Sequence, residues 1–134
     1  MPRLTLAQAS TYIERALQEA AEIGIRISVA VVDEAGHLVA LQRMDGAGWV
    51  TTDIAYGKAY TAAAFGAPSA DVAERWRDAS LFAHAVTVMT HGRLTPRMGG
   101  LPIKIGEELA GAIGASGGTG EQDVQVVKAA LGMS

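Results

Sequence analysis

The chain has 134 residues, a formal net charge of −3 and no cysteine, and 49% of its residues are hydrophobic although only 5% are aromatic. It has no run of Lys or Arg, which argues against a nucleic-acid partner, and the lack of cysteine excludes thiolate metal sites, thiol nucleophiles and disulfides. We expect neither a signal segment nor a membrane partner, because no apolar run reaches spanning length, and we therefore expect a cytoplasmic protein.

The hydrophobic composition also predicts self-association. With so few aromatic residues, the core must be built from Ala, Val, Ile and Leu. A chain this short and apolar commonly covers part of its surface with another copy of itself. We expect a homo-oligomer, either a dimer or a larger ring.

The N-terminal segment predicts a helix. Hydrophobic residues recur at helical spacing from Leu6 to Ile23. A capping box, Thr5-x-x-Gln8, precedes this run, and Gly24 follows it as a C-terminal cap.

A β-hairpin is predicted next. Residues 25–32 alternate in the manner of a strand, the turn Asp33-Glu34-Ala35-Gly36 follows, and residues 37–44 form the returning strand. The glycine at the end of the turn supplies the positive φ that such turns need.

The remaining elements are predicted from an alanine-rich stretch, a Pro-Ser start signal and two apolar runs. In chain order we expect a helix over residues 51–65, a helical stretch from Pro68 through Trp76 toward Met89, a strand or ordered loop over 91–100, strands over 103–105 and 109–116, and a closing helix over 121–131.

This order, α-β-β-α-α-β-β-β-α, contains hairpins rather than alternating βα units. It therefore predicts an α+β fold with a five-stranded antiparallel sheet and helices packed on it. No linker or repeat divides the chain, so we expect a single domain over residues 1–134.

The glycine-rich turn Gly117-Gly118-Thr119-Gly120 does not predict a phosphate site. It lacks the Lys-Ser/Thr pair of a Walker loop and the G-x-G-x-x-G spacing of a dinucleotide fingerprint. Thr119 and Gln122 instead form a capping box, and Glu121 and Asp123 bring negative charge to the start of the last helix. We interpret the segment as a tight strand-to-helix turn.

Charged residues at the predicted strand ends and on the alanine-rich helix are the candidates for chemistry. Lys58 stands among Ile54, Ala55, Ala59 and Ala62, an apolar setting in which an ammonium needs a partner. In the structural interpretation, Lys58 or Arg43 forms a salt bridge with Asp33 or Asp45. In the functional one, Lys58 and Arg43 hold a ligand carboxylate, with Thr51, Thr52 and Thr61 as hydroxyl donors.

Five motifs, in one order along nearly the whole chain, carry a resemblance to a known family. They are Val29-Ala30-Val31-Val32-Asp33-x-x-Gly36-x-Leu38, Arg43-Met44-Asp45-Gly46, Ile54-Ala55-x-x-Lys58-Ala59-x-Thr61-Ala62, Gly99-Gly100-Leu101-Pro102-Ile103, and Gly111-Ala112-Ile113-Gly114-x-Ser116-Gly117-Gly118 followed by Gln122-Asp123. Together they resemble the GlcG/HbpS-like haem-binding family, which is similar to the C-terminal domain of PduO-type corrinoid adenosyltransferases.

The resemblance implies a profilin-like domain, usually assembled into dimers or larger rings. It also implies haem binding, with some members implicated in haem degradation. Adenosyltransferase activity belongs to a different domain of the two-domain relatives and is not expected.

A haem site needs an axial ligand, an apolar slot and donors for the propionates. The axial candidates are His37, His84, His91, Tyr12, Tyr56, Tyr60 and the methionines. Lys58 and Arg43 are the candidate cations for a propionate. Gly99 and Gly100, in a loop that can form a pocket wall before Pro102, let a ligand or a neighbouring subunit approach the backbone.

Glu19 and Glu22 are three residues apart on the first predicted helix and so share a face. This spacing can hold iron if a third ligand arrives from elsewhere, whereas the structural interpretation is a solvated helix face.

Our leading hypothesis is a protein that binds haem or a related tetrapyrrole. The alternative is an enzyme that acts on a small carbonyl or carboxylate metabolite, with Lys58 and Arg43 as anion holders and Asp33 or a histidine as the acid–base group. A further alternative is an accessory partner of a catabolic enzyme.

Overall fold

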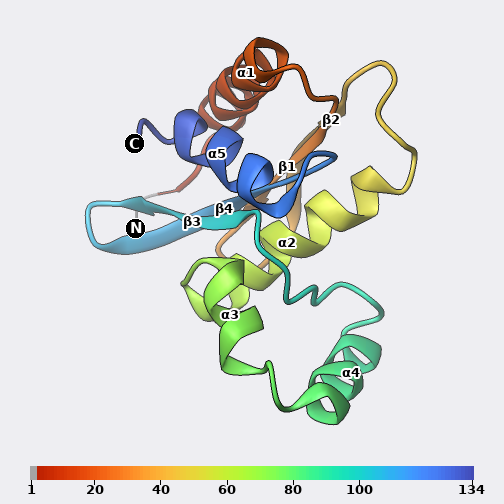
Figure 1. Ribbon diagram of the computed structural model, residues 1–134. Coiled ribbons are helices and arrows are strands. Elements are labelled where there is room, and N and C mark those ends of the chain that lie inside the picture. Colours follow the sequence, from red (N-terminus) through yellow and green to blue (C-terminus); the bar gives the residue numbers. More distant parts are fainter. Residues whose placement is uncertain (1–2) are drawn as a thin grey trace.

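The structure, a computed structural model, describes residues 3–134, which form five helices and four strands (Figure 1). All strands pair antiparallel in one sheet of order β2-β1-β4-β3, so β2 and β3 are its edges. The helices are α1 (Leu6–Ile23), α2 (Thr51–Phe65), α3 (Ser69–Arg75), α4 (Ser80–Met89) and α5 (Gly120–Ala130), and the strands are β1 (Ser28–Asp33), β2 (Leu38–Arg43), β3 (Gly100–Ile105) and β4 (Glu108–Ser116).

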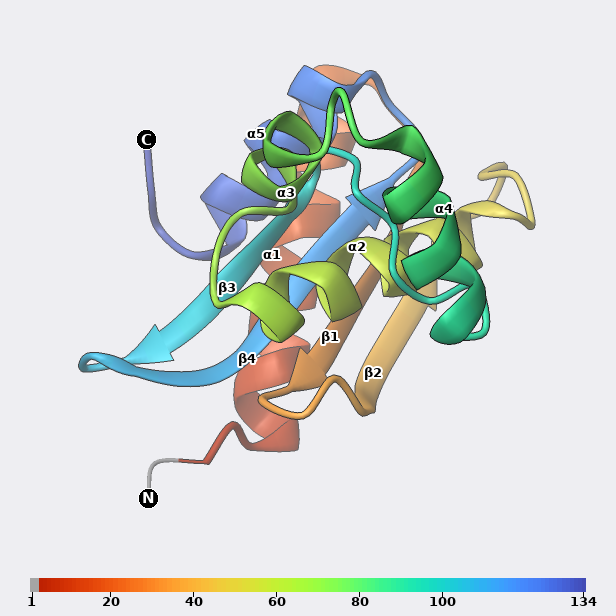
Figure 2. The same cartoon turned by 90° about the horizontal axis from the view of Figure 1, so that it is seen from below.

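The sheet separates two layers of helices. α1 and α5 cover one face and α2 covers the other, as the two orthogonal views show (Figure 1, Figure 2). Alternation along β1 serves both layers, because Val29 and Val31 belong to the core under α1 and α5, whereas Ala30 and Val32 belong to the core under α2. The α1/α5 side holds branched side chains, and the α2 side is built mostly from alanine.

Small residues let α2 lie directly on the sheet. Ala30, Gly114 and Gly100 are paired across β1, β4 and β3 and form a row beneath this helix. A Cβ atom on Gly114 would lie 2.6 Å from the amide nitrogen of Ala59, and one on Gly100 would lie 2.8 Å from the carbonyl carbon of Lys58. The backbone of α2 therefore touches the sheet where any side chain would force it away.

α1 shows how the amphipathic pattern is used. Ala9, Ile13, Ala16 and Ala20 are fully buried, while most of the intervening positions carry polar side chains. Neither α1 nor any other helix of the described segment is long and apolar enough to cross a membrane.

Local signals in the sequence are confirmed at several element ends. Both predicted capping boxes form, at Thr5 with Gln8 and at Thr119 with Gln122. Gly24 ends α1 in the left-handed conformation, and the hairpin of β1 and β2 turns at residues 33–36. The predicted helix over residues 51–65 has the bounds of α2.

The five-stranded sheet and the element order predicted with it are wrong. The sheet has four strands because residues 91–99 are a loop. The element order also differs because the helical stretch after Pro68 divides into α3 and α4. The order is therefore α-β-β-α-α-α-β-β-α. In the middle of the loop the backbone bonds to side chains, since the Thr95 amide donates to the Thr61 hydroxyl at 2.7 Å and the Leu94 amide donates to the Thr90 hydroxyl at 3.0 Å.

Candidate functional site

Lys58 of α2 and Asp123 of α5 form a buried ion pair, which we name the charged centre. The ammonium Nζ donates to Asp123 Oδ2 and to the Ala115 carbonyl, each at 2.9 Å. The other carboxylate oxygen, Oδ1, accepts the Gly118 amide hydrogen at 2.9 Å. The side chains of Lys58 and Asp123 are only 5% and 3% exposed.

The turn between β4 and α5 positions this carboxylate. The Thr119 hydroxyl accepts the Gln122 amide hydrogen at 3.2 Å, which fixes the first turn of α5. Gly99, with φ of +126°, leaves room for the ammonium, because a Cβ atom there would lie 2.8 Å from Lys58 Nζ. Sequence reasoning found the cation but missed Asp123 as its partner. The predicted salt bridge from Lys58 to Asp33 or Asp45 is wrong.

The ion pair links the two helix layers. α2 and α5 lie on opposite faces of the sheet, and the pair joins them at the C-terminal end of β4. Removing one partner of such a pair leaves an uncompensated charge in the interior. The Lys58–Asp123 pair is therefore first of all a structural link.

A polar pocket of about 330 Å³ opens beside the ammonium. Lys58, Ala73, Pro96, Arg97, Met98 and Gly120 line it. Arg97 is exposed and forms no ion pair within residues 3–134, so it supplies positive charge that Asp123 does not neutralise. The pocket has the size and charge for a small anion. The enzyme alternative, made with Lys58 and Arg43 as anion holders, stays a prediction, and the lining of this pocket contains Arg97 and not Arg43.

Three of the predicted ligand-binding residues lie next to Lys58. Gly99 faces the ammonium and Gly100 lies beneath α2. Thr61 is fully buried, and its hydroxyl donates to the Gly57 carbonyl at 2.8 Å while it accepts the Thr95 amide. Its role in the structure is to hold the 91–99 loop against α2.

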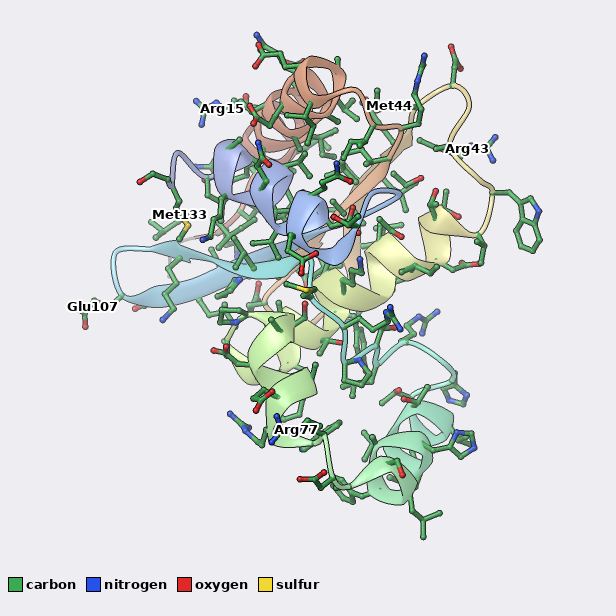
Figure 3. The ribbon with its side chains drawn as sticks, in the orientation of Figure 1. Arg15, Arg43, Met44, Arg77, Glu107 and Met133 are labelled. Atoms are coloured by element: carbon green, nitrogen blue, oxygen red, sulfur yellow. The ribbon has the colours of Figure 1, made fainter. Side chains whose placement is uncertain are left out.

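Arg43, Thr51 and Thr52 lie away from that centre. Arg43 is exposed at the end of β2 and points outward (Figure 3). The hydroxyls of Thr51 and Ser28 are 2.8 Å apart, and Thr52 donates to the Trp49 carbonyl at 3.0 Å. These two threonines begin α2, so the structure does not bring them together with Lys58.

Asp33 and His37 belong to the hairpin turn. Asp33 Oδ1 accepts the amide hydrogens of Ala35 and His37, each at 2.9 Å. The His37 ring is 80% exposed, with Nδ1 3.6 Å from Asp33 Oδ2. His84 and His91 are also exposed.

Of the two glutamates predicted to hold iron, only Glu19 forms a side-chain hydrogen bond within the described chain. Glu19 Oε2 accepts a hydrogen bond from Gln125 Nε2 of α5 at 2.9 Å, and Glu22 is exposed. Across residues 3–134 no three His, Asp or Glu side chains gather as a metal site would need. The iron site at Glu19 and Glu22 stays a prediction.

A second cavity, of about 370 Å³, follows the edge strand β3, and we name it the β3 groove. It lies between β3, α1 and the segment after α5, where Met133 is seen close to β3 (Figure 3). Its lining residues are Tyr12, Pro68, Leu101, Pro102, Ile103, Lys104, Leu131 and Met133. Pro102 fits an edge strand because it has no amide hydrogen to pair.

The β3 groove combines apolar walls with a few polar atoms. Tyr12 contributes a phenol, Met133 a thioether and Lys104 an ammonium. Neither Tyr12 nor Lys104 has a side-chain hydrogen bond or ion pair to any residue of the described chain. Apolar walls, an oxygen or sulfur donor for iron and a cation for a carboxylate are what haem requires, so these residues fit that group.

Sequence reasoning located only part of this groove. It named Tyr12 and the methionines, which include Met133, among the axial candidates. The loop before Pro102 that it named as a pocket wall lies at the polar pocket instead, where Met98 is part of the lining. Lys104 and Leu131 were missed, although a proline directly before a predicted strand was an available signal.

Comparisons with known proteins agree on one family. The family model described as "Haem degrading protein HbpS-like" matches residues 4–132. Protein GlcG of Escherichia coli is 35% identical over 113 residues, which are 84% of this chain and 81% of GlcG.

Two solved structures share the fold. A double mutant of Streptomyces reticuli HbpS is 32% identical, with a TM-score of 0.85 over 98% of this chain and 87% of that one. The structure described as a PduOC:heme complex is 23% identical, with a TM-score of 0.88 over 98% and 94% of the two chains, and shows the fold alone.

Proposed function

Because this chain belongs to the HbpS-like family, we propose that it is a small cytoplasmic protein that binds haem or a related tetrapyrrole in the β3 groove. The observation that carries the proposal is the composition of this groove, in which apolar walls stand beside a phenol and an ammonium. The polar pocket at Lys58 offers fewer apolar walls.

Each group of the β3 groove has a part in the proposed binding. Pro102, Leu131 and Met133, the partly exposed apolar side chains of the lining, would cover the apolar face of the macrocycle. Tyr12 would give a phenolate oxygen to iron, and Lys104 would pair with a propionate. Haem, when bound, supplies redox-active iron.

The family supports the same ligand, because its model is described as a haem degrading protein. Degradation of the ligand by this chain stays a prediction, as does an accessory role beside a catabolic enzyme.

Haemin titration followed by absorbance tests the proposal. The native protein should bind about one haemin per subunit with a saturable Soret shift. Tyr12→Phe removes only the hydroxyl and should weaken haemin binding by about 10- to 100-fold, the usual effect of disturbing a metal's ligation. It should also change the visible bands that report the axial ligand.

Tyr60→Phe is the matched control, because Tyr60 lies on α2 on the other side of the sheet. It should leave the titration unchanged, as should His37→Ala, His84→Ala and His91→Ala. A native-like titration for both Tyr12→Phe and Lys104→Gln would refute the β3 groove as the site.

We further propose that the protein self-associates. The support is its aliphatic composition and the large hydrophobic side chains that it exposes on α4. Exposed apolar patches of this kind mark interaction surfaces.

A further inference from the structure

Helix α4 is apolar, uncharged and sparsely packed. Its sequence, SLFAHAVTVM, contains no Asp, Glu, Lys or Arg, and none of its residues is buried. Within the described chain its backbone approaches no other helix or strand, and its aromatic contact is made by Phe82, whose ring lies edge-on to Trp76 with the ring centroids 5.2 Å apart. It lies at the end of an arm that leads away from the sheet, below α2 and beyond α3 (Figure 1).

The two sides of α4 differ. Ala83, Val86, Thr87 and Thr90 are half-buried, and the Thr87 hydroxyl donates to the Leu94 carbonyl at 2.9 Å. On the opposite side Leu81 and Phe82 are 83% and 55% exposed, and Val88 and Met89 are 61% and 67% exposed. Ala85, also exposed, lies at the centre of that outer side.

A helix of this kind is not self-sufficient in water. Isolated helices shorter than about 12–15 residues are marginal, and protein helices gain most of their stability by packing an apolar face. The outer side of α4 gathers four large apolar side chains that are 55% to 83% exposed, and contiguous apolar patches mark interaction sites. A second apolar surface packed on its outer side would therefore stabilise α4.

The spacing of the outer side chains favours a second copy of α4 as the partner that packs on them. Leu81 and Met89 are four residues before and after Ala85, and Phe82 and Val88 are three before and after it. The pattern is symmetric about Ala85, with a small residue at the centre and large ones at both ends. Two copies of α4 packed antiparallel would place Leu81 against Met89 and Phe82 against Val88, and the two Ala85 residues would meet on the axis.

We propose that α4 pairs antiparallel with α4 of a second copy of this chain, about a two-fold axis at Ala85. Such a contact is isologous, the commonest kind in homo-oligomers, and the lack of charge on α4 means that no like charges meet. A standard interface buries about 800 Å² per partner, so the helix pair supplies a large part of one contact. The inference rests on the proposed self-association and specifies its surface.

Disulfide trapping tests the axis, and the chain suits it because it has no native cysteine. In Ala85→Cys, the two thiols would lie across the axis, where Cβ atoms about 3.5–4.5 Å apart can form a disulfide. Mild oxidation should convert most of the variant to a covalent dimer. Ala21→Cys, at an exposed position of α1, is the control and should stay mostly uncross-linked.

Ala85→Glu provides the second arm, because it would place two carboxylates opposite each other on the axis. Sedimentation should show a smaller assembly than the native protein, with an unchanged thermal transition, since Ala85 is exposed in the single chain. If the native chain is monomeric at every concentration tested, both the proposed self-association and the α4 interface are refuted. If it assembles but Ala85→Cys does not cross-link and Ala85→Glu assembles normally, self-association stands and α4 is the wrong surface.

Discussion

Replacing Lys58 by methionine should lower the free energy of unfolding by about 3–5 kcal/mol, the usual cost of breaking a buried ion pair from one side. Methionine keeps a long flexible side chain but leaves the Asp123 carboxylate, 3% exposed, without its ammonium partner. Denaturation followed by circular dichroism measures the loss.

Lys104→Met is the matched control, because it removes an exposed ammonium that has no ion pair to the rest of the described chain. Its effect should stay within about 0.5 kcal/mol. Should Lys58→Met cost no more than this control, the Lys58–Asp123 pair would not be the link between the helix layers.

Gly114→Ala should destabilise the protein by about 3 kcal/mol or more, at the upper end of what overpacking a core costs. The added Cβ atom would meet the Ala55 carbonyl oxygen and lie 2.6 Å from the Ala59 amide nitrogen, both of them backbone atoms of α2. Backbone cannot rotate away as a side chain can, so α2 would have to leave the sheet. Thermal and chemical unfolding report the effect.

Gly48→Ala adds the same methyl group where the nearest atom, Thr51 Cγ2, is 4.0 Å away. Its stability should stay within about 0.5 kcal/mol of the native value. Equal effects of the two substitutions would contradict the close seating of α2 on the row of small residues.

The parts of the fold that sequence predicted correctly depend on residues close together in the chain. The capping box at Thr119 and Gln122 spans three residues, and the hairpin turn is four residues long. For residues 91–100 the sequence left a strand and an ordered loop open, and only the strand was counted in the predicted sheet. The amides of this segment bond to hydroxyls such as that of Thr61, 34 residues away from Thr95, which no local pattern reveals.

The partner of Lys58 also could not be predicted from residues close to it in the chain. Lys58 stood out because its neighbours on the helix are apolar, which predicts burial. Asp123 was interpreted as a charge at the start of α5, and its pairing with Lys58 joins residues 65 apart in the chain. Only the fold decides which carboxylate meets a buried ammonium, so Asp33 and Asp45 appeared equally suitable.

The position of bound haemin in the protein tests the central claim most directly. Ferric iron broadens the amide NMR signals of nearby residues, and zinc protoporphyrin serves as the diamagnetic reference. We predict that haemin broadens the signals of Leu101, Ile103, Lys104 and Leu131 and leaves those of Ala73 and Gly120, beside Lys58, sharp. Broadening confined to Ala73, Arg97 and Gly120, with sharp signals along β3, would contradict the assignment of the β3 groove.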